Sequence, residues 1–175
     1  MTDVLMAYAT KNGSTRHVAE AVTAAMREAG AQVTALPARQ ARESVAGYDL
    51  VVLGAPLYSG RWHRDAHRFL KRHRRELAAA CVAVFGMGPR TDTEEAWGRS
   101  RAQLDRALAK RAWLAPMAIT IFGGMDPPRR GNRPQRDLRN WQTIHTWAAD
   151  TRATAIRAGQ TAANPVVKLR SADAD

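Results

Sequence analysis

Five short apolar runs follow one another along this sequence, and segments of helical periodicity separate them. The runs lie at residues 4–8, 33–36, 50–54, 81–85 and 117–122, and each is predicted to be a β-strand. The run at 50–54 is apolar without alternation, which is typical of a central strand covered on both faces. The second run ends at Pro37, which indicates a strand at the edge of a sheet.

The segments between and after these runs are predicted to be helices. One ends before Gly30, a weak one spans 41–45, one spans 63–77, one follows a capping pair formed by Thr91 and Glu94, and the last begins near Leu138. The last helix is expected to turn four residues inward, namely Trp141, Ile144, Trp147 and Ala148. Strict alternation of strands and helices is typical of an α/β fold with a parallel sheet.

The fold predicted from this alternation is a doubly wound sheet of five parallel strands in the order 2-1-3-4-5, with helices on both faces in three α/β/α layers. One domain is expected at residues 1–160, followed by a C-terminal tail at 161–175 that frays from Asn164 onward. The stretch 126–134 is rich in Pro, Gly and Arg and is expected to be a loop.

The composition indicates one globular cytoplasmic domain. A chain of 175 residues, of which 45% are hydrophobic, is long enough to bury a core without disulfides. Its single cysteine, Cys81, opens an apolar run and is expected to be buried, and one cysteine excludes both an internal disulfide and a cysteine-ligated cluster. The first residues form neither a basic leader nor an apolar stretch of signal-peptide length, which indicates the cytoplasm.

Basic residues outnumber acidic ones by a wide margin. The chain has 27 Lys and Arg against 16 Asp and Glu, a formal net charge of +11. Such a charge attracts polyanions. The helix expected at 63–77 includes the run Lys71-Arg72-His73-Arg74-Arg75, for which a solvated helix face is the plain interpretation. The alternative is a contact with an acidic protein or an anionic lipid surface at the membrane periphery, whereas nucleic acid is not the expected partner.

The connection after the first strand has the residues of an anion site. In open parallel sheets, ligands bind at the carboxyl ends of the strands where the strand order reverses, here after the first and third strands. Thr10-Lys11-Asn12-Gly13-Ser14-Thr15 follows the first strand and leads directly into a helix. Hydroxyl groups, an amide and a glycine at a helix N-terminus favour a phosphate. The alternative is that Ser14 or Thr15 only caps the helix.

The connections after the third and fourth strands hold further candidates. Gly54-Ala55-Pro56-Leu57-Tyr58-Ser59-Gly60 includes the end of the third run and is expected to form a rigid loop, and the rings of Tyr58 and Trp62 suit a flat aromatic ligand. The alternative is that both rings belong to the core. Gly86, Met87 and Gly88 follow the fourth strand, where glycines allow the backbone to approach the edge of a ligand.

These loops resemble the phosphate and flavin loops of the flavodoxin family. Thr10, Asn12, Gly13, Ser14 and Thr15 match the first, and Gly54, Pro56, Tyr58 and Gly60 match part of the second. The resemblance extends to about Ala158 and implies bound flavin mononucleotide (FMN), with its phosphate in the first loop and its isoalloxazine between the second loop and the segment 86–88. Either Tyr58 or Trp62 is the ring expected to stack on the flavin.

Within the flavodoxin family, the sequence is similar to the protoporphyrinogen dehydrogenase branch. The segments that carry this similarity are 58–63, which runs into the basic helix, and 141–148. The similarity implies an FMN-dependent oxidoreductase that works with a redox partner protein or a small electron acceptor such as a quinone. The menaquinone-dependent enzymes carry a long amphipathic insert before the last helix, where this chain has only 127–134. His63 is the titratable candidate for delivering a proton.

Two other functions stay open: a pure electron-transfer flavodoxin, and a basic interaction module that keeps the fold without the cofactor. A dinucleotide fingerprint and a Walker loop are absent after the first strand. A receiver domain would need acidic residues where Ala9-Thr10 and Gly54-Ala55 stand. His63 and His67 are four positions apart, but a zinc protease would need glutamate where Arg64 stands, so no metal is expected.

Overall fold

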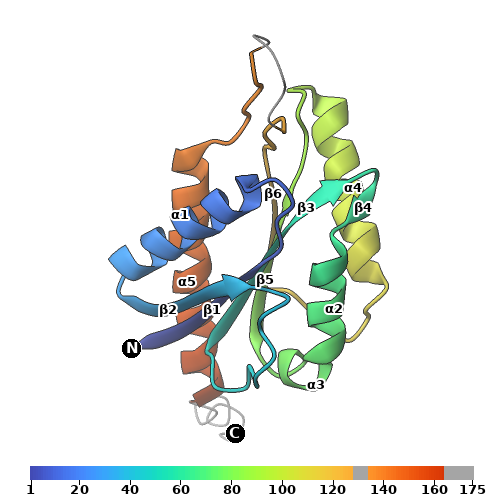
Figure 1. Cartoon of the computed structure of the whole chain (residues 1–175). Helices are drawn as coiled ribbons and strands as arrows, with labels where there is room; N and C mark the ends of the chain where they lie inside the picture. The colour runs from blue at the N-terminus through green and yellow to red at the C-terminus, as the bar shows by residue number, and fades with distance from the viewer. Residues whose placement is uncertain (128–133, 164–175) are drawn as a thin grey trace, which may run out of the picture.

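The computed structural model describes residues 1–127 and 134–163, which form a parallel sheet between two layers of helices (Figure 1). The strands are β1 (Thr2–Tyr8), β2 (Ala31–Pro37), β3 (Leu50–Tyr58), β4 (Arg61–Trp62), β5 (Cys81–Met87) and β6 (Ala118–Phe122). All pairs are parallel except β4, a two-residue strand that returns antiparallel to the end of β3. The order β2-β1-β3-β5-β6 confirms the predicted order of the five main strands.

The helices cover both faces of the sheet. α1 (Ser14–Glu28) and α5 (Trp141–Ala163) lie side by side on one face, and α2 (Arg64–Arg72), α3 (Arg74–Leu77) and α4 (Glu94–Ala109) lie on the other (Figure 1). Side chains alternate along each strand, so β1 sends Leu5 into the core under α2 and α4 and Met6 into the core under α1 and α5. Two buried cores result, as the predicted three-layer arrangement requires. No helix in the described part of the chain is long and apolar enough to cross a bilayer.

The helix predicted at 41–45 is wrong, because the crossover from β2 to β3 is irregular there. Side chains of the neighbouring layer hold part of its backbone in place, beside a few local turns. The Glu76 carboxylate accepts hydrogen bonds from the Val45 backbone N–H at 3.1 Å and the Ser44 hydroxyl at 2.8 Å. Ala41 and Val45 are still buried, which explains why their spacing resembled a helix.

The single helix predicted at 63–77 is interrupted at His73, which ends α2 and begins α3. His73 is buried, its Nε2 lies 2.8 Å from the Ala41 carbonyl oxygen and its Nδ1 lies 3.1 Å from Glu76. These contacts fix the imidazole against the irregular crossover. The break between α2 and α3 therefore lies where the His73 side chain contacts the irregular crossover from β2 to β3.

Smaller corrections concern the last two helices. The hydroxyl of Thr93, not Thr91, caps α4 by accepting from the Ala96 backbone N–H at 3.2 Å. In α5, Ile144 and Ala148 are buried as predicted, but Trp141 is 47% exposed and lies against the Arg139 guanidinium. α5 continues to Ala163, and the stretches 128–133 of the predicted loop and 164–175 of the predicted tail lie outside the described residues.

Candidate functional site

The connection from β1 to α1 leaves the helix N-terminus without a side-chain cap. Gly13 is the N-cap residue, with a φ of 87° that favours glycine, and no side chain of the described residues accepts a hydrogen bond from the first turn. The Thr10 hydroxyl instead accepts from the Gly13 backbone N–H at 3.0 Å, which holds the loop itself in shape. The alternative that Ser14 or Thr15 only caps the helix is therefore not what the structure shows.

A buried hydroxyl without a partner lies at this helix N-terminus. Thr15 is 1% exposed, and its Oγ1 has no hydrogen-bond partner among the described residues. Ser14, next to it, is also buried. Buried polar groups are normally paired, so an unpaired hydroxyl beside free helix N–H groups fits an oxyanion such as a phosphate.

The loop after β1 meets the end of β3 through Asn12 and Tyr58. The Asn12 side-chain amide donates to the Tyr58 phenolic oxygen at 3.4 Å, and the Lys11 ammonium lies 5.5 Å from the centre of the Tyr58 ring. Burial raises the pKa of Tyr58, and the positive charge of Arg90 acts in the opposite direction. Tyr58 is thus a half-buried ring bordered by cationic side chains from two other loops.

The segment expected to be a loop after the third strand is a β-hairpin instead. β3 continues through Pro56 and Leu57 to Tyr58, and Ser59 and Gly60 form the turn into β4, with φ angles of 48° and 75°. Positive φ at both central residues suits the right-handed twist of paired strands. In this hairpin Tyr58 is half-buried and Ser59 is exposed.

The two aromatic residues of this hairpin differ in environment. Trp62 is 2% exposed, and its indole N–H donates to the Ala55 carbonyl oxygen at 3.1 Å, so its ring belongs to the core under α2 and α4. Tyr58 is left as the accessible ring.

His63 is the N-cap residue of α2, where its Nδ1 accepts a hydrogen bond from the Asp65 backbone N–H at 3.2 Å. Burial lowers the pKa of His63, the Asp65 carboxylate acts in the opposite direction, and the charges of Arg64 and Lys11 lower the pKa further.

The glycines after the fourth predicted strand are required by packing against the neighbouring strand β6, whether or not a ligand binds. A Cβ at Gly88 would lie 2.5 Å from Ile121, and one at Gly86 would lie 2.9 Å from the same side chain. Met87 is 3% exposed and belongs to the core under α1 and α5. Gly86 and Met87 continue β5, and only Gly88 reaches the cavity described next.

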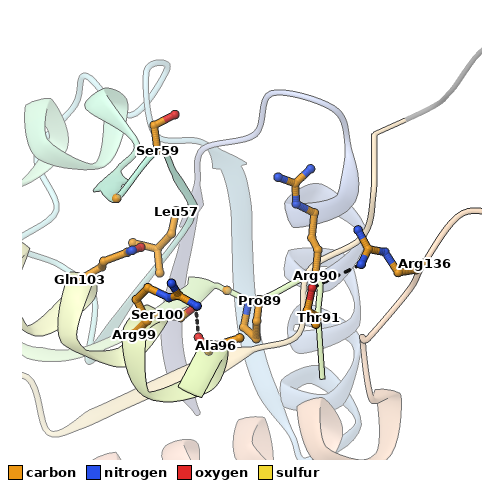
Figure 2. Close-up of a pocket in the computed structure, with 12 residues that line it drawn as sticks. Leu57, Ser59, Pro89, Arg90, Thr91, Ala96, Arg99, Ser100, Gln103 and Arg136 are labelled. Carbon is orange, nitrogen blue, oxygen red and sulfur yellow. Dashed lines mark hydrogen bonds between the residues drawn. The ribbon is translucent and has the colours of Figure 1, made fainter. Parts of the chain in front are cut away.

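A cavity of about 350 Å³ opens between the β3–β4 hairpin and the segment after β5 (Figure 2). Figure 2 shows Arg90 and Arg136 on one side and Arg99 and Gln103 of α4 on the other. The remaining lining is Leu57, Ser59, Gly60, Gly88, Pro89, Thr91, Ala96 and Ser100. The three guanidinium groups make this cavity suited to a polar or anionic ligand.

Arg136 reaches the cavity from a distant part of the chain. Its Nε lies 3.1 Å from the carboxylate of Asp126, which is 1% exposed, and its terminal nitrogen donates to the Thr91 hydroxyl at 3.3 Å. Arg90 approaches the same carboxylate at 3.9 Å. A buried carboxylate thus orients two of the three arginines.

Of the residues predicted from sequence, the structure brings Leu57, Ser59, Gly60 and Gly88 to the cavity and Lys11, Asn12 and Tyr58 to the neighbouring loop contact. Sequence reasoning missed the α4 residues Arg99, Ser100 and Gln103. Their spacing places them on one face of the helix that follows a predicted site loop. That spacing could have been used to predict them as site residues. No local pattern pointed to Arg136.

Comparisons with known proteins identify the family. The family model described as "Flavodoxin domain" matches residues 5–129. The chain is 24% identical over 127 residues to protoporphyrinogen IX dehydrogenase [quinone] of Escherichia coli strain K12, an alignment that covers 71% of this chain and 70% of that protein.

Solved structures share the fold at low sequence identity. Flavodoxin 1 of Bacillus cereus matches with a TM-score of 0.61 and 18% identity, covering 87% of this chain and 98% of that one. Rubredoxin oxygen:oxidoreductase of Desulfovibrio gigas matches with a TM-score of 0.58 and 15% identity, covering 90% of this chain and 37% of that one. Both likenesses concern the arrangement of strands and helices described above.

Proposed function

This chain belongs to the flavodoxin-domain family, and from that membership we propose that it binds FMN at the loops after β1, β3 and β5 and serves as a redox protein. Bound FMN supplies the redox chemistry, and the protein supplies binding, orientation and electrostatics.

The observation that carries the proposal is the unpartnered Thr15 hydroxyl at the uncapped N-terminus of α1. In this assignment the Ser14 and Thr15 hydroxyls and the first backbone N–H groups of α1 hold the FMN phosphate. Tyr58, the hairpin turn and the segment 88–91 hold the isoalloxazine, with Arg90 nearby as a positive charge. The cavity of Figure 2 supports the second half of this assignment, because the hairpin turn and the segment 88–91 both line it.

A pair of matched variants tests the phosphate site. Thr15 and Thr23 are both buried in α1, and neither hydroxyl has a hydrogen-bond partner among the described residues, but Thr23 lies two turns further along the helix. We expect Thr15→Val to weaken FMN binding by about 1–3 kcal/mol and Thr23→Val to leave it unchanged. Equal FMN affinity of both variants in a fluorescence titration would refute the assignment.

We further propose that the chain is an FMN-dependent oxidoreductase related to protoporphyrinogen IX dehydrogenase rather than a pure electron carrier. The 24% identity to that enzyme and the arginine-lined cavity beside the hairpin support a substrate with negative groups. The rivals are a pure electron-transfer flavodoxin and a cofactor-free interaction module. Quinone is one electron acceptor to test, and His63, which borders the hairpin, stays the candidate for a proton donor.

Two measurements separate these functions. Purified protein with flavin absorption near equimolar amounts supports a flavoprotein and argues against the cofactor-free module. Oxidation of protoporphyrinogen IX by the flavoprotein, followed with a quinone and with artificial acceptors, then tests the enzymatic role. Absence of turnover with every acceptor would favour the electron carrier.

A further inference from the structure

A basic groove runs between α2 and α4 on the face of the sheet opposite α1 and α5. Two adjoining hollows of about 530 and 370 Å³ form it, and His67 and Lys110 line both. Six of its permanent cations are Arg61, Arg64, Arg68, Lys71, Arg106 and Lys110, and no Asp or Glu in the described part of the chain lines either hollow. We call this surface the α2–α4 groove.

Most of this positive charge is not neutralised by the residues that the structure describes. Arg64 and Arg68 face the single carboxylate of Asp65 at 3.9 and 3.6 Å. The other four of these cations, Arg61, Lys71, Arg106 and Lys110, form no ion pair with any described residue, and all four are exposed. Like charges gathered in a concave surface repel one another, so their arrangement favours a polyanionic partner that fills the space between them.

We propose that the α2–α4 groove is the docking site of an acidic protein partner, whose Asp and Glu side chains enter between α2 and α4. Charge complementarity of this kind accelerates association and selects partners in transient complexes. The groove adjoins the candidate site, because Gly60 and Gln103 line both the groove and the cavity of Figure 2. A protein seated there would lie next to the β3–β4 hairpin.

Two other anionic partners fit the surface less well. Stable membrane binding needs apolar side chains that enter the lipid, and the large exposed hydrophobic residues of the described chain, Met1 and Trp141, lie outside the groove. Single-stranded nucleic acid needs open aromatic faces for its bases. In the groove, Trp62 is buried, and the Arg74 guanidinium lies over the Trp113 ring at 5.8 Å.

The positive potential also acts on the one histidine shared by both hollows. His67 Nδ1 is buried without a hydrogen-bond partner among the described residues. Burial lowers the pKa of His67, and the charges of Arg111 and Lys110 lower it further. The groove thus favours the neutral form of His67, and its positive charge comes from Arg and Lys.

Binding of fluorescein-labelled poly-L-glutamate, measured by anisotropy at low ionic strength, tests the proposal. The docking proposal goes beyond the proposed function, because docking needs the groove cations and does not need the flavin. Lys71→Glu/Lys110→Glu reverses two groove charges that form no ion pair with described residues. Arg39→Glu/Arg157→Glu makes the same charge change at exposed positions after β2 and in α5. We expect the groove variant to bind at least about tenfold more weakly and the control variant to lose less than about threefold.

Equal losses in both variants would overturn the proposal, because they would show that only net charge matters. The proposal would also be overturned if the groove variant lost more affinity for polythymidylate or for phosphatidylserine vesicles than for poly-L-glutamate. A second measurement needs no variant: a carbodiimide joins the carboxylates of bound poly-L-glutamate to nearby lysine amines of the wild-type protein. Coupling should map to Lys71 and Lys110; equal or stronger coupling at the exposed Lys11 would contradict the site.

Discussion

The side-chain amide of Asn12 donates a hydrogen bond to the phenolic oxygen of Tyr58, 3.4 Å away, and so joins the loop that follows β1 to the end of β3. The two residues are 46 positions apart, and the parallel pairing of β1 with β3 brings them together. The contact links the candidate phosphate site to the accessible aromatic ring.

Substitution of Tyr58 should separate the role of its ring from that of its hydroxyl. Tyr58→Phe keeps the ring and loses a long, exposed hydrogen bond, so FMN affinity should stay within about threefold. Tyr58→Leu removes the aromatic face and should weaken FMN binding by about 0.5–1.5 kcal/mol. The measurement is a flavin fluorescence titration. Trp62→Phe is the control: because Trp62 is buried and bonded to Ala55, it should lower stability and leave FMN affinity intact.

The positive charge of Arg90 should raise the reduction potential of bound FMN. Reduced flavin gains negative charge, and one unit charge at ~8 Å in an effective dielectric of 20 contributes about 2 kcal/mol before salt screening. We therefore expect Arg90→Gln to lower the potential by several tens of millivolts in a spectroelectrochemical titration. Arg61 lines the α2–α4 groove rather than the cavity, so Arg61→Gln should have a smaller effect. Unchanged potentials in both would place the charges too far from the flavin.

Acidification should destabilise the protein through His63 and His67. Burial lowers the pKa of both below the ordinary value of 6.5, so the unfolded chain binds more protons than the folded one as the pH falls. This contribution to stability is complete above pH 6.5 and is lost as the pH falls through the folded-state pKa values. Thermal unfolding from pH 8 to pH 5 should show Tm falling, and His63→Asn/His67→Asn should flatten that fall. An unchanged slope would mean that other groups dominate.

The Glu76 carboxylate should stabilise the irregular crossover between β2 and β3. It accepts hydrogen bonds from Val45 and Ser44, and these bonds lower the pKa of Glu76, the Val45 backbone N–H contributing most. Glu76→Gln should therefore reduce the free energy of unfolding by about 1–2 kcal/mol in urea, with FMN affinity unchanged. Glu20→Gln, which breaks only an exposed helical ion pair with Arg16, should cost less than about 0.5 kcal/mol. Equal effects of both would show that the Glu76 contacts contribute little.

The sequence by itself determined the five main strands, their order and the helices α1, α4 and α5. Periodicity in short windows reports which faces are buried, and a helix such as α1 carries its own stop at Gly30, where φ is 88°. The anion-binding pattern of Thr10 to Thr15 was also visible, because those residues are neighbours in the chain. Whether they bind FMN stays a prediction.

Only the tertiary structure decided which ring of the hairpin is accessible, where the helix predicted at 63–77 breaks, and which arginines share a cavity. Trp62 is buried because the β3–β4 turn folds it under α2, and His73 interrupts the helix because it meets Ala41. Arg90 and Arg136 are 46 positions apart and converge on Asp126. Contacts of this kind depend on how separate elements pack against one another, and the periodicity of a short window does not predict that packing.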